Sequence, residues 1–239
     1  MNDIMKLFND YAKTFDLKDP KIMEKFHHSY RVMEFAEAIG NSINLNEEDM
    51  HIVKIAALFH DIARFEQWTQ YETYIDSKSF DHGDMEYKIL KEKFIDKLGL
   101  TENEQEIVLK AVKNHNKFKV EDNVTDKELL ICNIIRDADK LDIMKEQGFI
   151  KQEYKVKEEI LNDLKNHNMI KNNLIDNEMD ALCRLISFIF DLNFKYSFEY
   201  LLHKKIIENK INLIEIYGNK DLSNLQDNLI NYMKGRLEC

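Results

Sequence analysis

The chain has 239 residues, of which 44% are hydrophobic and 33% are charged, and its formal net charge is −10 at pH 7. This composition supplies enough apolar surface for one large folded domain, and it excludes both a disordered chain and an integral membrane protein. The acidic balance argues against binding to nucleic acid polymers, which requires dense positive charge, but it is compatible with a small phosphorylated substrate because a metal ion can supply positive charge locally.

The scarcity of turn-forming residues predicts an all-α fold. One proline and six glycines are few for the tight turns of a β-sandwich or a doubly wound sheet. Pro20 suits the first turn of a helix that extends to Ile39 and stops at Gly40. Asn46 is a suitable N-cap for the next helix, because the first turn after it is acidic and apolar residues then recur at helical spacing.

Helix start and stop signals continue along the chain. A further helix is predicted to begin at residues 79–81 and to stop at Gly99. Two capping boxes, in which a glutamate follows a threonine by three residues, predict two more helix starts: Thr101 with Glu104, and Thr125 with Glu128. The second of these helices is expected to run to Met144.

The remaining segments have weaker patterns. Residues 65–80 are the least regular part of the sequence and are expected to form a loop near the site. Between residues 152 and 233 the pattern predicts two or three more helices. Since no repeat, low-complexity tract or linker interrupts the sequence, a single helical domain over residues 1–239 is expected.

The cysteines and the N-terminal residues indicate a cytoplasmic protein. Cys132, Cys183 and Cys239 are odd in number and far apart, which is typical of a reduced protein without a disulfide framework. Residues 1–10 lack the apolar run of a signal peptide. The most apolar stretch, residues 182–202, is interrupted by charged residues, which favours a buried helix over a membrane span.

The clearest chemical signal is the pair His60-Asp61 at the end of an apolar helix. Because Leu58, Phe59 and Ile62 flank it, the pair is expected to be partly buried, and burial without partners is costly for polar groups. A metal ion would satisfy both groups. Four further residues of suitable type lie in separate predicted helices: His28, His82, His115 and Asp139. Helical bundles build metal sites from inward-facing side chains of adjoining helices, so these residues are predicted to converge.

The order of these residues resembles the HD superfamily of metal-dependent phosphohydrolases. The similarity is strongest in three segments: His28-Ser29-x-Arg31-Val32, Leu58-Phe59-His60-Asp61-Ile62-Ala63-Arg64 and Ala138-Asp139-Lys140-Leu141-Asp142. The resemblance implies a helical bundle with a metal-binding core over residues 20–145. Residues 150–239 would form an additional helical extension packed on that core, where the helices either shape the pocket or form a homodimer.

The resemblance also implies a ligand set. The core ligands would be His28, His60, Asp61 and Asp139. His82 and His115 would complete a second metal position, with Asp61 bridging two ions. Alternatively, His82 and His115 bind substrate phosphate beside a single ion, or only cap helix ends. Imidazole together with carboxylate favours one or two ions of manganese, iron, cobalt, nickel or zinc over calcium.

Hydrolysis of a phosphate ester or nucleotide is the reaction that this resemblance implies. A metal ion lowers the pKa of a bound water from about 15.7 toward 7, which would supply hydroxide for in-line attack on phosphorus. Asp61 would be central to catalysis, and Arg64 and Lys140 are expected to balance charge on the phosphoryl group. Related proteins often have a lysine in place of Arg64.

Two other functions stay open at this point. An HD-type oxygenase would use the same six ligands to hold two irons, and only its oxygen chemistry would distinguish it. A non-catalytic module that senses a nucleotide is the second alternative, although such a module has no need of a complete ligand set. Within the hydrolase interpretation, the substrate could be a nucleotide, a dinucleoside polyphosphate, a cyclic dinucleotide or a sugar phosphate.

Overall fold

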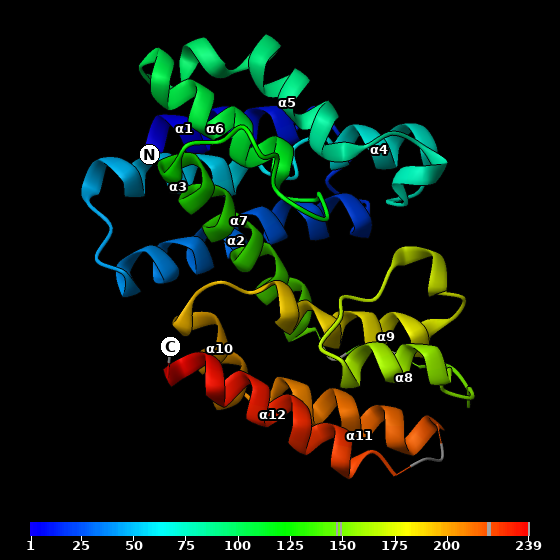
Figure 1. The fold of residues 1–239 in the computed structure, drawn as a ribbon. Coiled ribbons are helices and arrows are strands. Elements are labelled where there is room, and N and C mark those ends of the chain that lie inside the picture. The colour runs from blue at the N-terminus through cyan, green and yellow to red at the C-terminus, as the bar shows by residue number, and fades with distance from the viewer. Residues whose placement is uncertain (147, 149, 219–220, 239) are drawn as a thin grey trace. The chain divides into compact units, whose positions relative to one another are not determined.

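The computed structural model describes residues 1–146, 148, 150–218 and 221–238, and its regular elements are helices (Figure 1). No β-strand occurs in these residues, so the all-α prediction is confirmed. None of the described helices combines the length and apolarity that a membrane crossing requires. Cys132 and Cys183 are buried free thiols, as predicted, whereas Cys239 lies outside the described residues.

The chain divides into two compact units, residues 1–139 and residues 140–239. The N-terminal unit contains α1 (Asn2–Ala12), α2 (Pro20–Ser42), α3 (Glu47–Phe59), α4 (Arg64–Tyr71), the 3₁₀ helix η1 (Asp76–Lys78), α5 (His82–Lys93), η2 (Ile95–Lys97), α6 (Glu102–Asn114) and most of α7 (Asp126–Lys145). The C-terminal unit contains α8 (Glu158–Lys165), η3 (Asn172–Leu174), α9 (Glu178–Ser187), η4 (Phe188–Asp191), α10 (Lys195–His203), α11 (Ile206–Gly218) and α12 (Ser223–Glu238). Each unit buries apolar side chains of its own. The packing of the C-terminal helices on the core stays a prediction.

An aromatic cluster fixes the end of α3, from which the His-Asp pair follows. The ring of Phe59, the last residue of α3, lies 5.6 Å from the ring of Phe8 in α1 and 5.3 Å from that of Phe94. All three side chains are buried, and such tilted or edge-to-face contacts between rings stabilise a core beyond the area they bury. Because Phe59 directly precedes His60, this packing holds the start of the site in place.

Side-chain caps define the helix starts, largely as the sequence predicts. Asn46 caps α3, and Thr101 and Glu104 form the predicted capping box at the start of α6. The same reciprocal bonds join Thr125 and Glu128, since the Thr125 N–H donates to the Glu128 carboxylate at 2.6 Å and the Glu128 N–H donates to the Thr125 hydroxyl at 3.3 Å. The helices that carry His115 and Asp139 therefore begin where local chemistry places them.

Two predicted helix ends are wrong. The helix predicted from Pro20, α2, begins there but continues through Gly40 to Ser42. Gly40 serves close packing instead of termination, because a Cβ there would lie 2.6 Å from the Met50 side chain. The helix predicted to reach Gly99 ends six residues earlier, at Lys93, and a 3₁₀ turn follows.

The segment over residues 65–80 is more regular than predicted. Its first part is α4, in which Phe65 and Gln67 are fully buried. Burial of these two side chains stabilises α4, whereas the mixed polarity of its eight residues does not predict a helix. Within this segment, the residues on either side of η1 lack regular structure, and Asp76, the first residue of η1, contacts the site, as described below.

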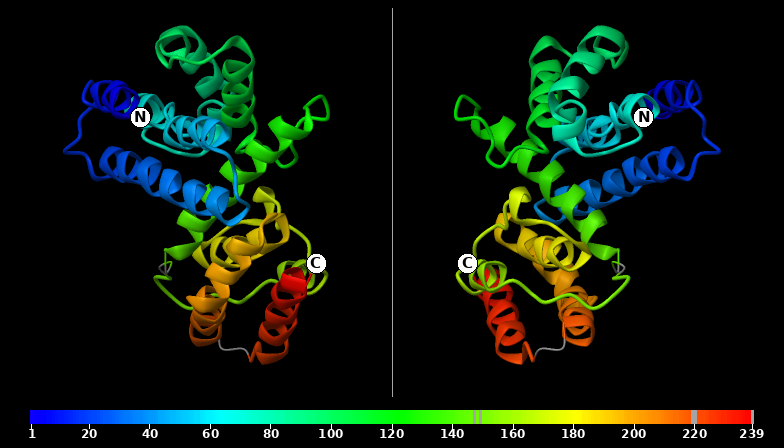
Figure 2. Two further views of the ribbon diagram at one scale, coloured as in Figure 1. Left: turned by 90° about the vertical axis from the view of Figure 1, so that its left-hand side faces the viewer. Right: turned by 90° about the vertical axis from the view of Figure 1, so that its right-hand side faces the viewer.

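The described residues after α7 form five α-helices, not the two or three that the sequence predicts. The apolar stretch of residues 182–202 is broken because α9 ends at Ser187, η4 follows, and the backbone is extended at Leu192 before α10 begins. Within this unit α12 contacts both α10 and α11, and α11 and α12 lie side by side in the two views of Figure 2.

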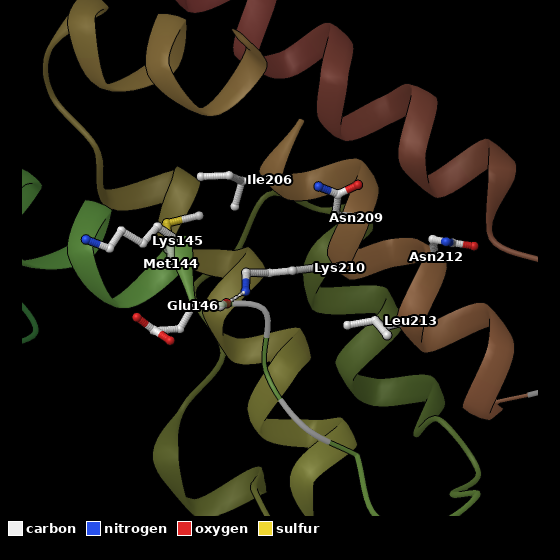
Figure 3. A pocket seen from close by; sticks show the side chains of 8 residues that line it. All are labelled: Met144, Lys145, Glu146, Ile206, Asn209, Lys210, Asn212 and Leu213. Atoms are coloured by element: carbon white, nitrogen blue, oxygen red, sulfur yellow. Dashed lines mark hydrogen bonds between the residues drawn. The ribbon is translucent and has the colours of Figure 1, made fainter. Parts of the chain in front are cut away.

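A cavity of about 250 Å³ lies in the C-terminal unit between the end of α7 and α11 (Figure 3). Its lining residues are Met144, Lys145, Glu146, Ile206, Asn209, Lys210, Asn212 and Leu213. The side chain of Lys210 is only 1% exposed, and its amine donates a hydrogen bond to the backbone carbonyl of Glu146. Burial lowers the pKa of Lys210 to about 8, because an apolar environment disfavours the ammonium form.

Candidate metal centre

The pair His60-Asp61 follows α3 directly and is buried, as the sequence predicts. His60 is the C-cap residue of α3 and has no exposed surface, and Asp61 is 3% exposed. The Arg64 N–H donates to the Asp61 carbonyl at 3.0 Å, and this tight turn leads into α4. His60 and Asp61 therefore lie in the turn between α3 and α4, next to the buried apolar end of α3.

A first group of donors consists of His28 from α2, His60 and Asp139 from α7. The His28 Nε2 atom lies 3.1 Å from Asp139 Oδ1, and His60 Nε2 lies 3.6 Å from the same oxygen. One donor atom from each residue lies within 4.8 Å of the others. Burial opposes ionisation of Asp139, but its contacts with His28 and His60 hold the pKa of this carboxyl well below its usual range. Three predicted residues thus converge from three helices.

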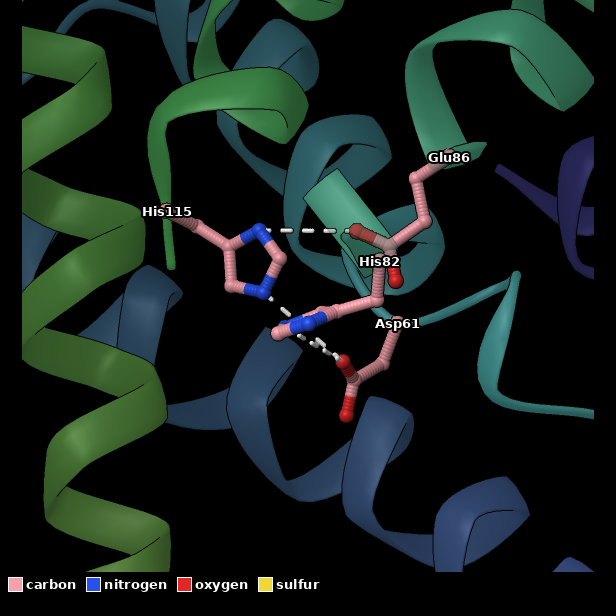
Figure 4. A group of neighbouring side chains, drawn as sticks. All are labelled: Asp61, His82, Glu86 and His115. Carbon is pink, nitrogen blue, oxygen red and sulfur yellow. Dashed lines mark ion pairs between the residues drawn. The ribbon is translucent and has the colours of Figure 1, made fainter. Parts of the chain in front are cut away.

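A second group of donors consists of Asp61, His82, Glu86 and His115, all of which are buried (Figure 4). His82 is the first residue of α5, and His115 is the C-cap residue of α6. One donor atom from each of the four residues again lies within 4.8 Å of the others. Burial lowers the pKa of His82 to about 4, so its ring is neutral at pH 7.

The Asp61 carboxylate lies between the two groups. Its Oδ2 atom is 3.4 Å from His28 Nε2 and 3.8 Å from His60 Nε2. Its Oδ1 atom is 3.9 Å from His82 Nε2 and 3.7 Å from His115 Nε2. One carboxylate oxygen thus faces each group, which is the arrangement that a bridging ligand requires.

Hydrogen bonds at Nδ1 fix the orientation of three histidine rings. The Nδ1 atoms of His60 and His115 lie 2.7 Å from the carbonyl oxygens of Ala57 and Val112. The Nδ1 atom of His82 lies 2.6 Å from the Asp76 carboxylate. Each Nδ1 therefore donates, and in a neutral ring Nε2 then holds a lone pair that faces the groups. Metal-ligating histidines have this same arrangement, in which an outer oxygen fixes the tautomer and the ring orientation.

The inward-facing nitrogens favour a cation between them. His60 Nε2 lies 3.2 Å from His28 Nε2, so two ring nitrogens face each other inside the site. Lone pairs at this separation repel unless a proton or a metal ion lies between them. The donor chemistry, imidazole nitrogens with carboxylate oxygens, suits a divalent transition metal, and the residues therefore fit the ion that the sequence predicts.

Two cations contact Asp61. Lys25 Nζ lies 2.6 Å from Asp61 Oδ2, and Arg64 Nε lies 3.2 Å from Oδ1. Arg64 Nη2 also donates to His82 Nε2 at 2.9 Å. Burial would raise the pKa of Asp61, but the charges of Lys25 and Arg64 outweigh it and hold this pKa well below the usual range.

The two residues predicted to balance phosphoryl charge have different surroundings. Arg64 lies at the second group, as described above. The amine of Lys140 lies 2.8 Å from the Asp191 carboxylate and 5.9 Å from the centre of the Phe188 ring, both within the C-terminal unit. The catalytic role of Lys140 therefore stays a prediction, and Lys25 is a cation at the site that sequence reasoning missed.

Three residues of the site were not predicted: Lys25, Asp76 and Glu86. Lys25 precedes His28 by three residues and Glu86 follows His82 by four, which places each on the same helix face as a predicted histidine. That spacing could have identified Lys25 and the helix face of Glu86, but not the burial of the Glu86 side chain. Asp76 lies in η1, outside any periodic pattern, and only the folded chain reveals its contact with His82.

Residues 26–144 match the family model of the HD domain. The matched segment contains both groups of donors, from His28 to Asp139. Among curated proteins and solved structures, none matches the chain.

Proposed function

The chain belongs to the HD domain family, whose members are mostly metal-dependent hydrolases, and on that premise we propose that it is a metal-dependent phosphohydrolase. The substrate is a small phosphate ester, such as a nucleotide. The position of the Asp61 carboxylate, with one oxygen toward each group of donors, is the observation that supports this proposal best. Residues 20–145 are the metal-binding core in this proposal, and residues 150–239 are the extension.

The proposed ligand set follows the two groups. His28, His60 and Asp139 would hold one divalent ion, His82 and His115 would hold a second, and Asp61 would contribute a carboxylate oxygen to each. Such a pair of ions would supply a water activated for attack and would stabilise the charge on the phosphoryl oxygens. The rings of His60 and His115 need no reorganisation on binding, because their Nε2 lone pairs already face inward.

Charge on the substrate is balanced by Arg64 and Lys25. Their side chains reach Asp61 from α4 and α2, so a phosphoryl oxygen beside this carboxylate comes within reach of both. Two cations next to the donors suit an anionic substrate such as a phosphate ester. The buried free thiols of Cys132 and Cys183 support a reducing compartment, in keeping with cytoplasmic activity.

The test begins with metal analysis of anaerobically purified protein, followed by a phosphatase screen with and without a chelator. We expect one or two transition-metal ions per chain and hydrolysis that the chelator abolishes. Asp61→Asn should lose bound metal, and its kcat/KM should fall by more than about 100-fold, the most that a change outside the ligand set usually costs.

The matched control is Asp122→Asn, which alters an exposed carboxylate that pairs with the neighbouring Lys119. This variant should keep metal and activity at the parent level. Retention of both properties in Asp61→Asn would falsify the proposal. Two irons together with oxygen uptake, and no hydrolysis under anaerobic conditions with manganese, would instead identify an oxygenase.

A further inference from the structure

Glu86 is a buried carboxyl group without a hydrogen-bonding partner. It lies on α5, one turn beyond His82, and none of its surface is exposed. Among the described residues, neither of its carboxyl oxygens has a hydrogen-bond partner. Glutamate is almost never fully buried in this way unless it is paired or binds a metal ion.

Orientation of a histidine does not explain this carboxyl group. In the described part of the chain, the group within ion-pair distance is the His115 ring, whose Nδ1 atom lies 3.5 Å from Glu86 Oε2. That Nδ1 atom already donates to the Val112 carbonyl at 2.7 Å, and 3.5 Å is long for a second hydrogen bond. His115 would therefore keep its orientation without Glu86.

Protonation does not resolve the burial either. A neutral carboxylic acid still has one O–H donor and one carbonyl acceptor, and both would be unpaired in the described surroundings. An apolar side chain of similar size would fill the same space without this cost. The carboxyl group is thus unfavourable in the protein alone and becomes favourable only with a partner that the chain itself does not supply.

We propose that Glu86 is a metal ligand, which completes the second group as a site for a divalent cation together with Asp61, His82 and His115. This inference rests on the proposed function and adds a ligand that neither the sequence nor the family resemblance assigns. Arg64 donates a hydrogen bond to His82 Nε2 at 2.9 Å, so an ion bound by His82 would take the place of Arg64 at that lone pair.

The added carboxylate makes the two groups chemically equivalent. Each then has two histidines, one carboxylate of its own and a share of Asp61. Two imidazoles with two carboxylates suit Mn²⁺ or Fe²⁺, which accept oxygen ligands readily. The three carboxylates also balance all but one of the positive charges of two divalent ions, and the remaining charge attracts an anionic substrate.

The experiment compares metal binding by the parent protein and Glu86→Gln. Each is loaded anaerobically with Mn²⁺, freed of excess metal by gel filtration, and analysed for manganese per chain; calorimetric titration gives the affinities. We expect two ions for the parent and one for Glu86→Gln, with the affinity for the second ion reduced by about 100-fold or more. Glu128→Gln is the matched control, because Glu128 is a buried glutamate that pairs with Lys110 at 2.9 Å; it should bind two ions.

Thermal unfolding of Glu86→Met guards against a variant that merely misfolds. Without metal this variant should be at least as stable as the parent, because an unpaired buried carboxyl group is gone, but Mn²⁺ should raise its melting temperature less. Two ions of unchanged affinity in Glu86→Gln overturn the inference and leave the proposed function intact. If the parent binds one ion and Glu86→Gln retains it, the inference is likewise overturned and the proposed function stays intact. A parent that binds no ion overturns both.

Discussion

The Asp76 carboxylate shows how one residue outside the donor groups organises several within them. It accepts the Nδ1 proton of His82 at 2.6 Å, and its other oxygen accepts from Arg64 at 3.2 Å and from Gln67 at 3.1 Å. Burial alone would raise the pKa of Asp76, but these hydrogen bonds and charges lower it. The ionised carboxylate therefore fixes both the tautomer of His82 and the position of Arg64.

Replacement of Asp76 should weaken metal binding without removing a donor. We expect Asp76→Ala to lower the affinity for the second ion by about 10–100-fold, the range typical of outer partners of ligating histidines. Asp76→Asn should lose less, since its amide oxygen still accepts from His82. Calorimetric Mn²⁺ titration measures both effects. Asp84→Ala, an exposed change on the same helix as His82, serves as the control, and a loss there as large as in Asp76→Ala would contradict the assigned role.

The predictability of single residues followed from their chemical types. The order of histidines and aspartates along the chain, which resembles that of the HD superfamily, identified the six predicted ligands, and these do converge in two neighbouring groups; their binding of metal stays a prediction. Glu86 was missed because most glutamates on helices are exposed. Its burial depends on the exact phase of α5 against α6, which the sequence pattern does not specify to one residue.

At the scale of elements, the contact between α5 and α6 determines how the second group is assembled. The two helices approach closely at Gly83, where a Cβ would lie 2.4 Å from the Asn116 side-chain oxygen and 2.6 Å from the Lys113 carbonyl. The rings of His82 and His115, which adjoin this contact, have centroids 4.9 Å apart. Glycine at this position thus allows two histidines from different helices to lie in contact within the second group.

Gly83→Ala should separate these two helices. The new methyl group overlaps a backbone carbonyl, so we expect a net loss of about 1–3 kcal/mol in the free energy of unfolding, despite the gain of up to about 1 kcal/mol that alanine brings to a helix. Affinity for the second ion should fall as well. Gly235→Ala in α12 is the matched control, because its Cβ meets no atom within 4 Å and should leave stability equal or slightly higher. Urea unfolding and Mn²⁺ titration of both variants decide the point.

Element boundaries were predictable where local bonds define them and not where distant contacts do. Asn46 and the two capping boxes act through neighbours within three residues, so the pattern alone identified these starts. The end of α5 depends on Phe94, whose ring packs on Phe59 and on Tyr11 of α1. Because no local sequence signal indicates that contact, the prediction that this helix extends to Gly99 is wrong.

At the scale of the molecule, the buried ionisable side chains of both donor groups belong to one unit. The donors run from His28 to Asp139 and therefore all belong to the N-terminal unit. Their side chains face one another in a space from which water is largely excluded, which is unfavourable without a counter-ion. Removal of metal should therefore destabilise this unit and spare the helices from α8 to α12.

Mass action gives the size of this effect. An ion present at 100 times its dissociation constant stabilises the folded state by about 2.7 kcal/mol, which corresponds to roughly 10 °C in the melting temperature of a domain of this size. We expect a chelator to lower the melting temperature by about that amount per ion and Mn²⁺ to restore it.

Hydrogen exchange measured by mass spectrometry locates the change, because peptides from α3, α5 and α6 should lose protection on chelation while peptides from α11 and α12 should not. The same chelator applied to Asp61→Asn should have little further effect, since the bridging carboxylate is already absent. Equal loss of protection in both units would show that the ion stabilises more of the chain than the unit that holds its donors.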